Sequence, residues 1–91
     1  MSNIIQLPKR FDYSAMNDFN ATVNTVIAGK PKKIFLDAML MDYIDSSGLG
    51  LLVMAYKKIH ESNSSMTIIN LKPSAREILL LANLQKLIDI K

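Results

Sequence analysis

The 91-residue sequence predicts a small α/β domain built on a mostly parallel four-stranded sheet with alternating helices. Short apolar runs rich in β-branched residues alternate with stretches of helical period, and Gly, Pro or Asn punctuates most changes from one to the other. Neither repeats nor linkers interrupt this alternation. Because 91 residues suffice for one hydrophobic core, we expect residues 1–91 to form a single domain.

The first strand is expected at residues 3–7, NIIQL, where Pro8 ends a β-branched run typical of an edge strand. A helix should follow, with Asp12 or Ser14 as its cap and Gly29 at its end. Its apolar residues share one helical face: Met16, Phe19, Val23, Val26 and Ile27.

The middle of the chain predicts a buried strand at 33–37, KIFLD, and a helix from Gly48 to about Glu61. The residues SNSS, 62–65, should end that helix, and MTIINL, 66–71, reads as the third strand. The helical period places these residues of the second helix toward the core: Leu49, Leu52, Val53, Tyr56, Ile59 and His60.

A third helix is expected after Pro73, with a capping box in which Ser74 is the N-cap and Glu77 the third helical residue. Asn83 should close this helix in a left-handed conformation, and LIDI, 87–90, predicts the last strand. Strands that alternate with helices in this way pair in parallel through right-handed crossovers.

Composition argues against several classes of function. The chain has no Cys and one His, so it lacks the ligands of a conventional zinc site, and no sequence motif calls for another metal or a cofactor. Its net charge of +3 is mild, and basic residues are scattered apart from KPKK, 30–33, so we expect no nucleic-acid partner. It has no apolar run long enough to cross a bilayer and no secretory signal, which predicts a cytoplasmic protein with no membrane insertion.

The segment DSSGLG, 45–50, stands where an apolar stretch leads into the second helix, the place where parallel sheets concentrate function. Asp, Ser and Gly are also what any helix start selects, so a simple helix cap is one interpretation. No Lys follows the glycines, which excludes a Walker phosphate loop. His60 lies too far along the same helix to activate a serine, so we expect no enzymatic activity.

A phosphoacceptor serine is the second interpretation, because a helix N-terminus stabilises an added phosphate through its free N–H groups and its dipole. On the helix that follows, a spacing of about 100° per residue turns Leu51, Met54 and Lys58 away from the expected core face. These residues are then either ordinary surface positions or a docking face for a protein partner. A phosphate beside them would oppose docking.

Residues 34–59, IFLDAMLMDYIDSSGLGLLVMAYKKI, resemble the signature of STAS domains, the family of bacterial anti-sigma factor antagonists, and a weaker likeness runs from about Phe11 to Ile90. The resemblance implies partner switching. The unmodified domain captures an anti-sigma factor, commonly a serine kinase of the GHKL type. Phosphorylation by that kinase ends the capture, and a PP2C-type phosphatase restores it.

Carried over by position, the resemblance makes Ser46 the phosphoacceptor. It implies that Asp45 assists the presentation of this serine, and that Ser47 and Gly48 shape the helix start. It places the partner surface at the residues that the helical period turns outward, Leu51, Met54 and Lys58.

The sequence also departs from the family pattern. Relatives usually have two strands before the first helix and often a closing helix after the last strand, so uncovered apolar surface would favour a homodimer. Asn63 stands where relatives often have Gly. A second class of function is a STAS subunit held permanently in a larger assembly, such as a lipid transporter or a stress-signalling complex. The intact Asp-Ser-Ser sequence favours the phosphorylated switch over this adaptor.

Overall fold

The structure is a computed structural model that describes residues 3–91. Its main sheet has four parallel strands in the spatial order β1-β3-β5-β6: β1 (Ile4–Gln6), β3 (Lys33–Asp37), β5 (Ser65–Ile69) and β6 (Asp89–Ile90). The α/β class and the four-stranded parallel sheet are therefore confirmed. The NIIQL run forms an edge strand, as its sequence predicts.

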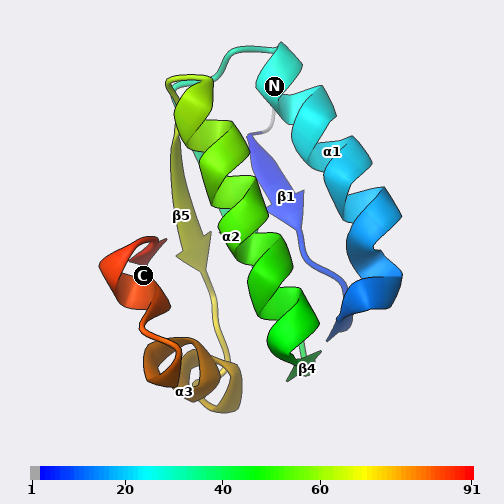
Figure 1. The fold of residues 1–91 in the computed structure, drawn as a ribbon, viewed down its shortest axis with the longest axis vertical. Helices are drawn as coiled ribbons and strands as arrows, with labels where there is room; N and C mark the ends of the chain where they lie inside the picture. Colours follow the sequence, from blue (N-terminus) through cyan, green and yellow to red (C-terminus); the bar gives the residue numbers. More distant parts are fainter. Residues whose placement is uncertain (1–2) are drawn as a thin grey trace.

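Two long helices, α1 (Met16–Ala28) and α2 (Ser46–Glu61), lie side by side over one face of the sheet (Figure 1). The short 3₁₀ turn η1 (Tyr13–Ala15) leads into α1. The third helix, α3 (Pro73–Leu81), lies beyond the carboxyl end of β5, and the turn η2 (Leu84–Lys86) connects it to β6. The carboxyl ends of the strands and the beginning of α2 thus meet at one end of the molecule.

The alternation of side chains along the strands decides which face carries the core. Ile34 and Leu36 of β3 and Met66 and Ile68 of β5 are buried beneath the helices. The parallel register aligns the intervening residues in rows on the opposite face, where one row contains Ile4, Phe35, Thr67 and Asp89. Continuous apolar runs predicted the strands, and the structure adds which residues of each run face the core.

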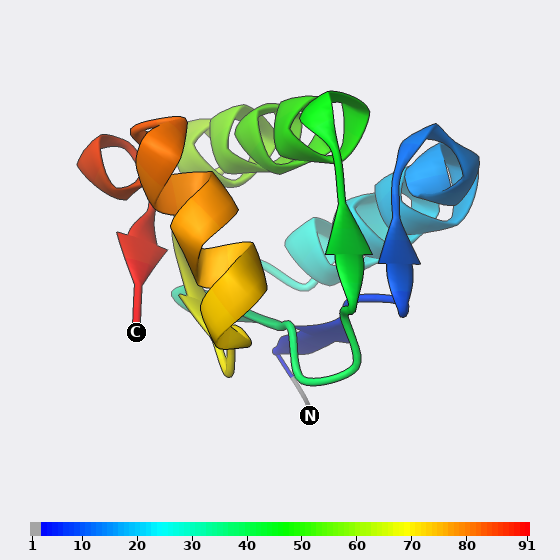
Figure 2. The ribbon, with the colours of Figure 1, turned by 90° about the horizontal axis from the view of Figure 1, so that it is seen from below.

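A second, two-stranded sheet was not expected. β2 (Arg10–Phe11) pairs in parallel with β4 (Tyr43–Ile44), and Figure 2 shows the two strands side by side, each running into the helix that follows it. Runs of two residues have too little length to show a period, so the sequence contains no clear signal for them. We call this pair the β2–β4 ribbon.

The start of α3 differs from the prediction. Pro73 is its first residue and Lys72 its N-cap, with no capping hydrogen bond from a side chain, so the capping box at Ser74 and Glu77 is wrong. A fixed φ makes Pro a good first helical residue, and it holds the preceding residue extended. The left-handed conformation expected of Asn83 is confirmed, with φ 61°, and Asn63 adopts φ 64° in its turn.

The packing of α2 on the sheet generates a first prediction. Leu52 is fully buried among the core residues, so Leu52→Ala should lower the free energy of unfolding by about 2–5 kcal/mol. Lys57→Ala, on the exposed side of the same helix, should change it by less than about 0.5 kcal/mol. Urea unfolding of both variants measures the difference, and equal losses would contradict the assigned orientation of α2.

Candidate functional site

Asp45 caps α2. It follows β4 with an extended backbone, φ −124° and ψ −169°, and its Oδ1 accepts hydrogen bonds from the Gly48 backbone N–H at 3.1 Å and the Ser47 hydroxyl at 2.6 Å. The helix therefore begins at Ser46, two residues earlier than predicted. The helix-cap interpretation is confirmed for Asp45, while both serines of the motif lie inside the first turn.

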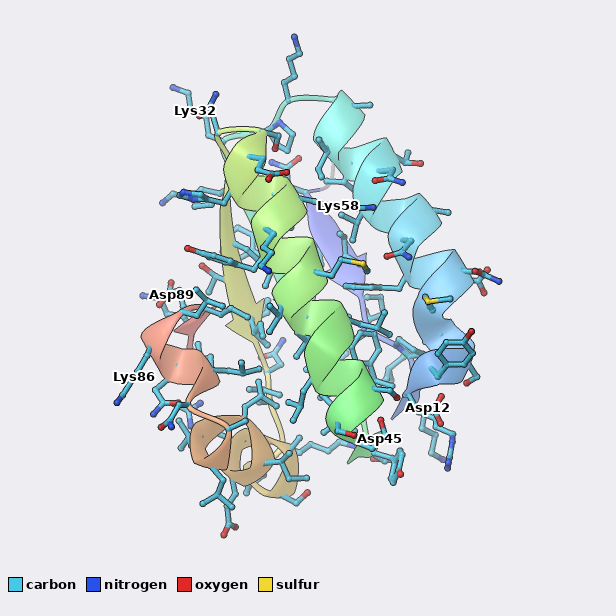
Figure 3. All side chains as sticks on the ribbon, viewed as in Figure 1. Asp12, Lys32, Asp45, Lys58, Lys86 and Asp89 are labelled. Atoms are coloured by element: carbon cyan, nitrogen blue, oxygen red, sulfur yellow. The ribbon has the colours of Figure 1, made fainter. Side chains whose placement is uncertain are left out.

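The two serines are not equivalent. Ser47 is partly buried and its hydroxyl is committed to Asp45. Ser46 is exposed, and among residues 3–91 its hydroxyl makes no hydrogen bond. Figure 3 shows that Asp45 lies where α2 begins, at the end of the helix far from Lys32. Of the two serines, Ser46 is therefore the one whose hydroxyl is exposed and uncommitted within residues 3–91.

The Asp45 carboxylate is held in its ionised form. The hydrogen bond from the Ser47 hydroxyl is the main cause, and the Gly48 backbone N–H adds to it, so that the pKa of Asp45 lies below its usual range. The negative charge of nearby Asp12 acts weakly in the opposite direction. A charged cap at a helix N-terminus also interacts favourably with the helix dipole.

Gly48 is required by close packing between α2 and the β2–β4 ribbon. A Cβ atom at this position would lie 2.1 Å from the carbonyl oxygen of Phe11 and 2.8 Å from Cγ1 of Ile44. No side chain fits against a backbone carbonyl at that distance. Gly50 differs, because a Cβ there would meet no atom within 4 Å.

The predicted partner stripe on α2 faces α1 instead of solvent. Leu51 is only 6% exposed and belongs to the core, and Met54 is half-buried against it. Lys58 points between the two helices in Figure 3, and its Nζ donates a hydrogen bond to Oδ1 of Asn24 on α1 at 3.3 Å. The prediction that these residues lie on an exposed face is therefore wrong for Leu51, and Lys58 is partly engaged by α1.

The error has a physical cause. Gly48 and Ala55 are buried, but small residues give no apolar signal in a helical period, so the expected core face was displaced around the helix. His60, predicted to face the core, is exposed and stacks on Tyr56 with ring centroids 5.6 Å apart. The exposed residues of the helix are Ser46, Gly50, Lys57, His60 and Glu61, while Val53 is partly buried against the core as predicted.

Sequence reasoning gave no site role to a polar cluster on the β2–β4 ribbon. Arg10 donates from Nε to Oδ2 of Asp12 at 2.6 Å, and its guanidinium lies 4.3 Å from the centre of the Tyr43 ring. The Tyr43 hydroxyl donates to Oδ2 of Asp45 at 3.4 Å. Asp12 caps η1 by accepting hydrogen bonds from the Ser14 backbone N–H and hydroxyl. The available signal was the repeated Asp-x-Ser pattern at 12–14 and 45–47.

Asp42 joins three segments beside the site. Its backbone N–H donates to the carbonyl of Lys9 at 2.8 Å, and its carboxylate pairs with Lys9 at 3.6 Å and more closely with Lys72 at the start of α3. The hydrogen bond from Lys72 is the main reason that the pKa of Asp42 lies below its usual range. For Asp12, the Ser14 hydroxyl is the leading cause of a lowered pKa, with Arg10 assisting.

The chain belongs to the STAS domain family, since the family profile matches residues 2–91. A curated relative, the STAS-domain containing protein PA14_20770 of Pseudomonas aeruginosa strain UCBPP-PA14, is 33% identical over 86 residues, which are 94% of this chain and 84% of that protein. Within residues 3–91 no helix is long and apolar enough to span a membrane. The same residues bring together no three His, Cys, Asp or Glu side chains that could hold a metal ion.

Solved structures share the fold. TM1081 of Thermotoga maritima, a candidate anti-sigma factor antagonist, has a TM-score of 0.81 at 22% identity, covering 99% of this chain and 80% of TM1081. The anti-sigma factor antagonist SpoIIAA of Bacillus, in its unphosphorylated form, has a TM-score of 0.71 at 21% identity, covering 97% of this chain and 76% of SpoIIAA. The phosphorylated form of SpoIIAA matches with a TM-score of 0.70.

The two glycines of the motif should respond oppositely to alanine. Gly48→Ala forces α2 away from the Phe11 carbonyl, so the free energy of unfolding should fall by about 1–3 kcal/mol or more. Gly50→Ala fills open space on an exposed helix and should raise it by about 0.5–1 kcal/mol. Urea or thermal unfolding measures both. A Gly48→Ala protein as stable as the parent would contradict the packing described.

Stability should also depend on pH through Asp12, Asp42 and Asp45. Each has a folded-state pKa below its usual range, so each stabilises the fold above an unfolded value of about 3.9, and this contribution is lost as pH falls through the folded value. The urea midpoint should therefore drop steeply below about pH 4. Asp45→Asn should flatten that drop, and an unchanged acid slope in this variant would show that the Asp45 cap contributes little.

Proposed function

We propose that this protein is an anti-sigma factor antagonist that acts by phosphorylation-controlled partner switching at Ser46. The observation that carries the proposal is the unbonded, exposed hydroxyl of Ser46 at the N-terminus of a helix whose cap is already supplied by Asp45. An added phosphate would displace no capping bond. SpoIIAA, which shares this fold, exists in unphosphorylated and phosphorylated forms, and this supports the same logic here.

In the unmodified state, the protein binds an anti-sigma factor through the outer face of α2. This face begins at Ser46 and continues through Gly50 and Lys57, with the partly buried Val53 between them, and Gly50 leaves the helix backbone open near the serine. Met54 and Lys58 border it on the side of α1. The proposed surface therefore replaces the stripe that included Leu51, which is buried.

Phosphorylation opposes this binding by adding about 1.5–2 negative charges where the partner must exclude water. A tenfold to hundredfold loss of affinity requires about 1.4–2.8 kcal/mol, which a buried or closely apposed charge readily supplies. The partner is a GHKL-type kinase that transfers the γ-phosphoryl group of ATP to Oγ of Ser46, releasing ADP and the hydroxyl proton. A PP2C-type phosphatase returns the serine by hydrolysis.

The domain itself is the substrate of this cycle and no enzyme. The carboxylate that precedes Ser46 is Asp45, whose Oδ1 accepts bonds from Ser47 and Gly48 and so acts as a cap, without serving as a general base. The adaptor function, a STAS subunit held permanently in a larger complex without phosphorylation, has no use for the exposed serine. It becomes one outcome of the following test.

The test combines mass spectrometry of the protein purified from its own host with partner capture by Ser46→Ala and Ser46→Asp. One phosphate should map to Ser46, and the Ala form should retain a GHKL kinase that the Asp form binds at least tenfold more weakly. Ser74→Ala and Ser74→Asp, at an exposed serine in the first turn of α3, are matched controls that should keep the parent affinity. An unmodified Ser46 with identical partners for every form would favour the adaptor.

A further inference from the structure

The β2–β4 ribbon places two capped helix starts next to each other. Phe11 pairs with Ile44 in parallel register, so the residues that follow them, Asp12 and Asp45, are neighbours across the ribbon. Figure 3 shows both aspartates at the same end of the molecule, where α2 begins. A phosphate on Ser46 would join two carboxylates that are already close together.

Arg10 is the cation of the β2–β4 ribbon that lies next to these two helix starts. It faces Tyr43 across the two strands and lies over its ring, and that ring's hydroxyl in turn reaches Asp45. Its side chain is 65% exposed. Of its five N–H donors, the Nε–H alone is used among the described residues, in the bond to Asp12. The two nearby lysines, Lys9 and Lys72, are engaged by Asp42 instead.

We propose that Arg10 is the counter-ion of phosphorylated Ser46, and that its guanidinium exchanges the ion pair with Asp12 for one with the phosphate. This inference rests on the proposed function and names the residue through which the phosphate is accommodated. A phosphate with nearly two negative charges attracts a cation more strongly than one carboxylate at the same distance. The forked guanidinium also binds phosphate through two parallel hydrogen bonds, whereas Asp12 receives one.

The surrounding contacts permit this exchange without unfolding the site. The Tyr43 ring, on the opposite strand, contacts the Arg10 guanidinium and can keep it in place while its hydrogen bond passes from Asp12 to the phosphate. Asp12 keeps its hydrogen bonds from the Ser14 backbone and hydroxyl, so the cap of η1 persists.

The test uses full-length protein in which phosphoserine is installed at position 46 during translation, so that no kinase is needed. Titration of the phosphate by ³¹P NMR should show its second pKa higher in Arg10→Gln than in the phosphorylated parent by about half a unit or more, because the dianion loses its counter-ion. Lys9→Gln is the matched control, since it removes an adjacent cation that is paired with Asp42, and it should shift the pKa less. Arg10→Lys should fall between the parent and Arg10→Gln.

The Nε–H resonance of Arg10 supplies a second readout in the parent sequence, so the test holds even if Arg10→Gln folds poorly. It should shift between the unmodified and the phosphorylated protein as the bond to Asp12 is exchanged. An unmoved resonance, or a phosphate pKa that Arg10→Gln changes no more than Lys9→Gln does, would overturn the proposal. Absence of phosphate on Ser46 in the host would instead overturn the proposed function and leave this titration standing.

Discussion

The contact between the first turn of α2 and the carbonyl oxygen of Phe11 is the constraint on which the site depends. Because Gly48 has no side chain, the helix can lie directly on the β2–β4 ribbon. Asp45 directly precedes the helix, and its Oδ1 accepts a hydrogen bond from the Gly48 N–H in the first turn. The close packing of helix and ribbon sets Arg10 and Tyr43 beside the cap. The glycine thus lets the helix start that carries the serine and its capping acid pack against the ribbon that carries Arg10.

The main strands and helices could be predicted because apolar runs and helical spacing of large apolar residues mark them locally. The residues 33–37 form β3 as expected, since Ile34 and Leu36 are buried and alternate with less buried neighbours. The ribbon could not be predicted, because each of its strands contains two residues and is held by pairing with a segment more than thirty residues away. The predicted start of α3 at Ser74 was wrong because Pro73 is already the first residue of the helix, which leaves Ser74 inside the first turn.

The sequence predicted the helix cap and the exposed serine correctly and misjudged the residues around them. DSSGLG predicts the cap and the exposed serine because Asp, Ser and Gly in this order favour a helix start, and that preference is local to the chain. The outward face of α2 depends on packing with α1 and on buried small residues such as Ala55, which no pattern of large apolar residues reveals. Arg10 escaped notice because its position beside the cap arises from strand pairing, which local sequence does not encode.

Different polar interactions join the chain segments at the two ends of the molecule. At the carboxyl end of the sheet, exposed ion pairs from Asp42 to Lys9 and Lys72 join the segments that flank the serine. At the opposite end, the turn after α2 relies on neutral hydrogen bonds, such as the one from the Ser64 hydroxyl to the carbonyl of Pro31 at 2.5 Å. Dissolved salt screens exposed ion pairs far more than it affects neutral hydrogen bonds. Added salt should therefore weaken the interactions at the end of the molecule that carries Ser46 more than those at the opposite end.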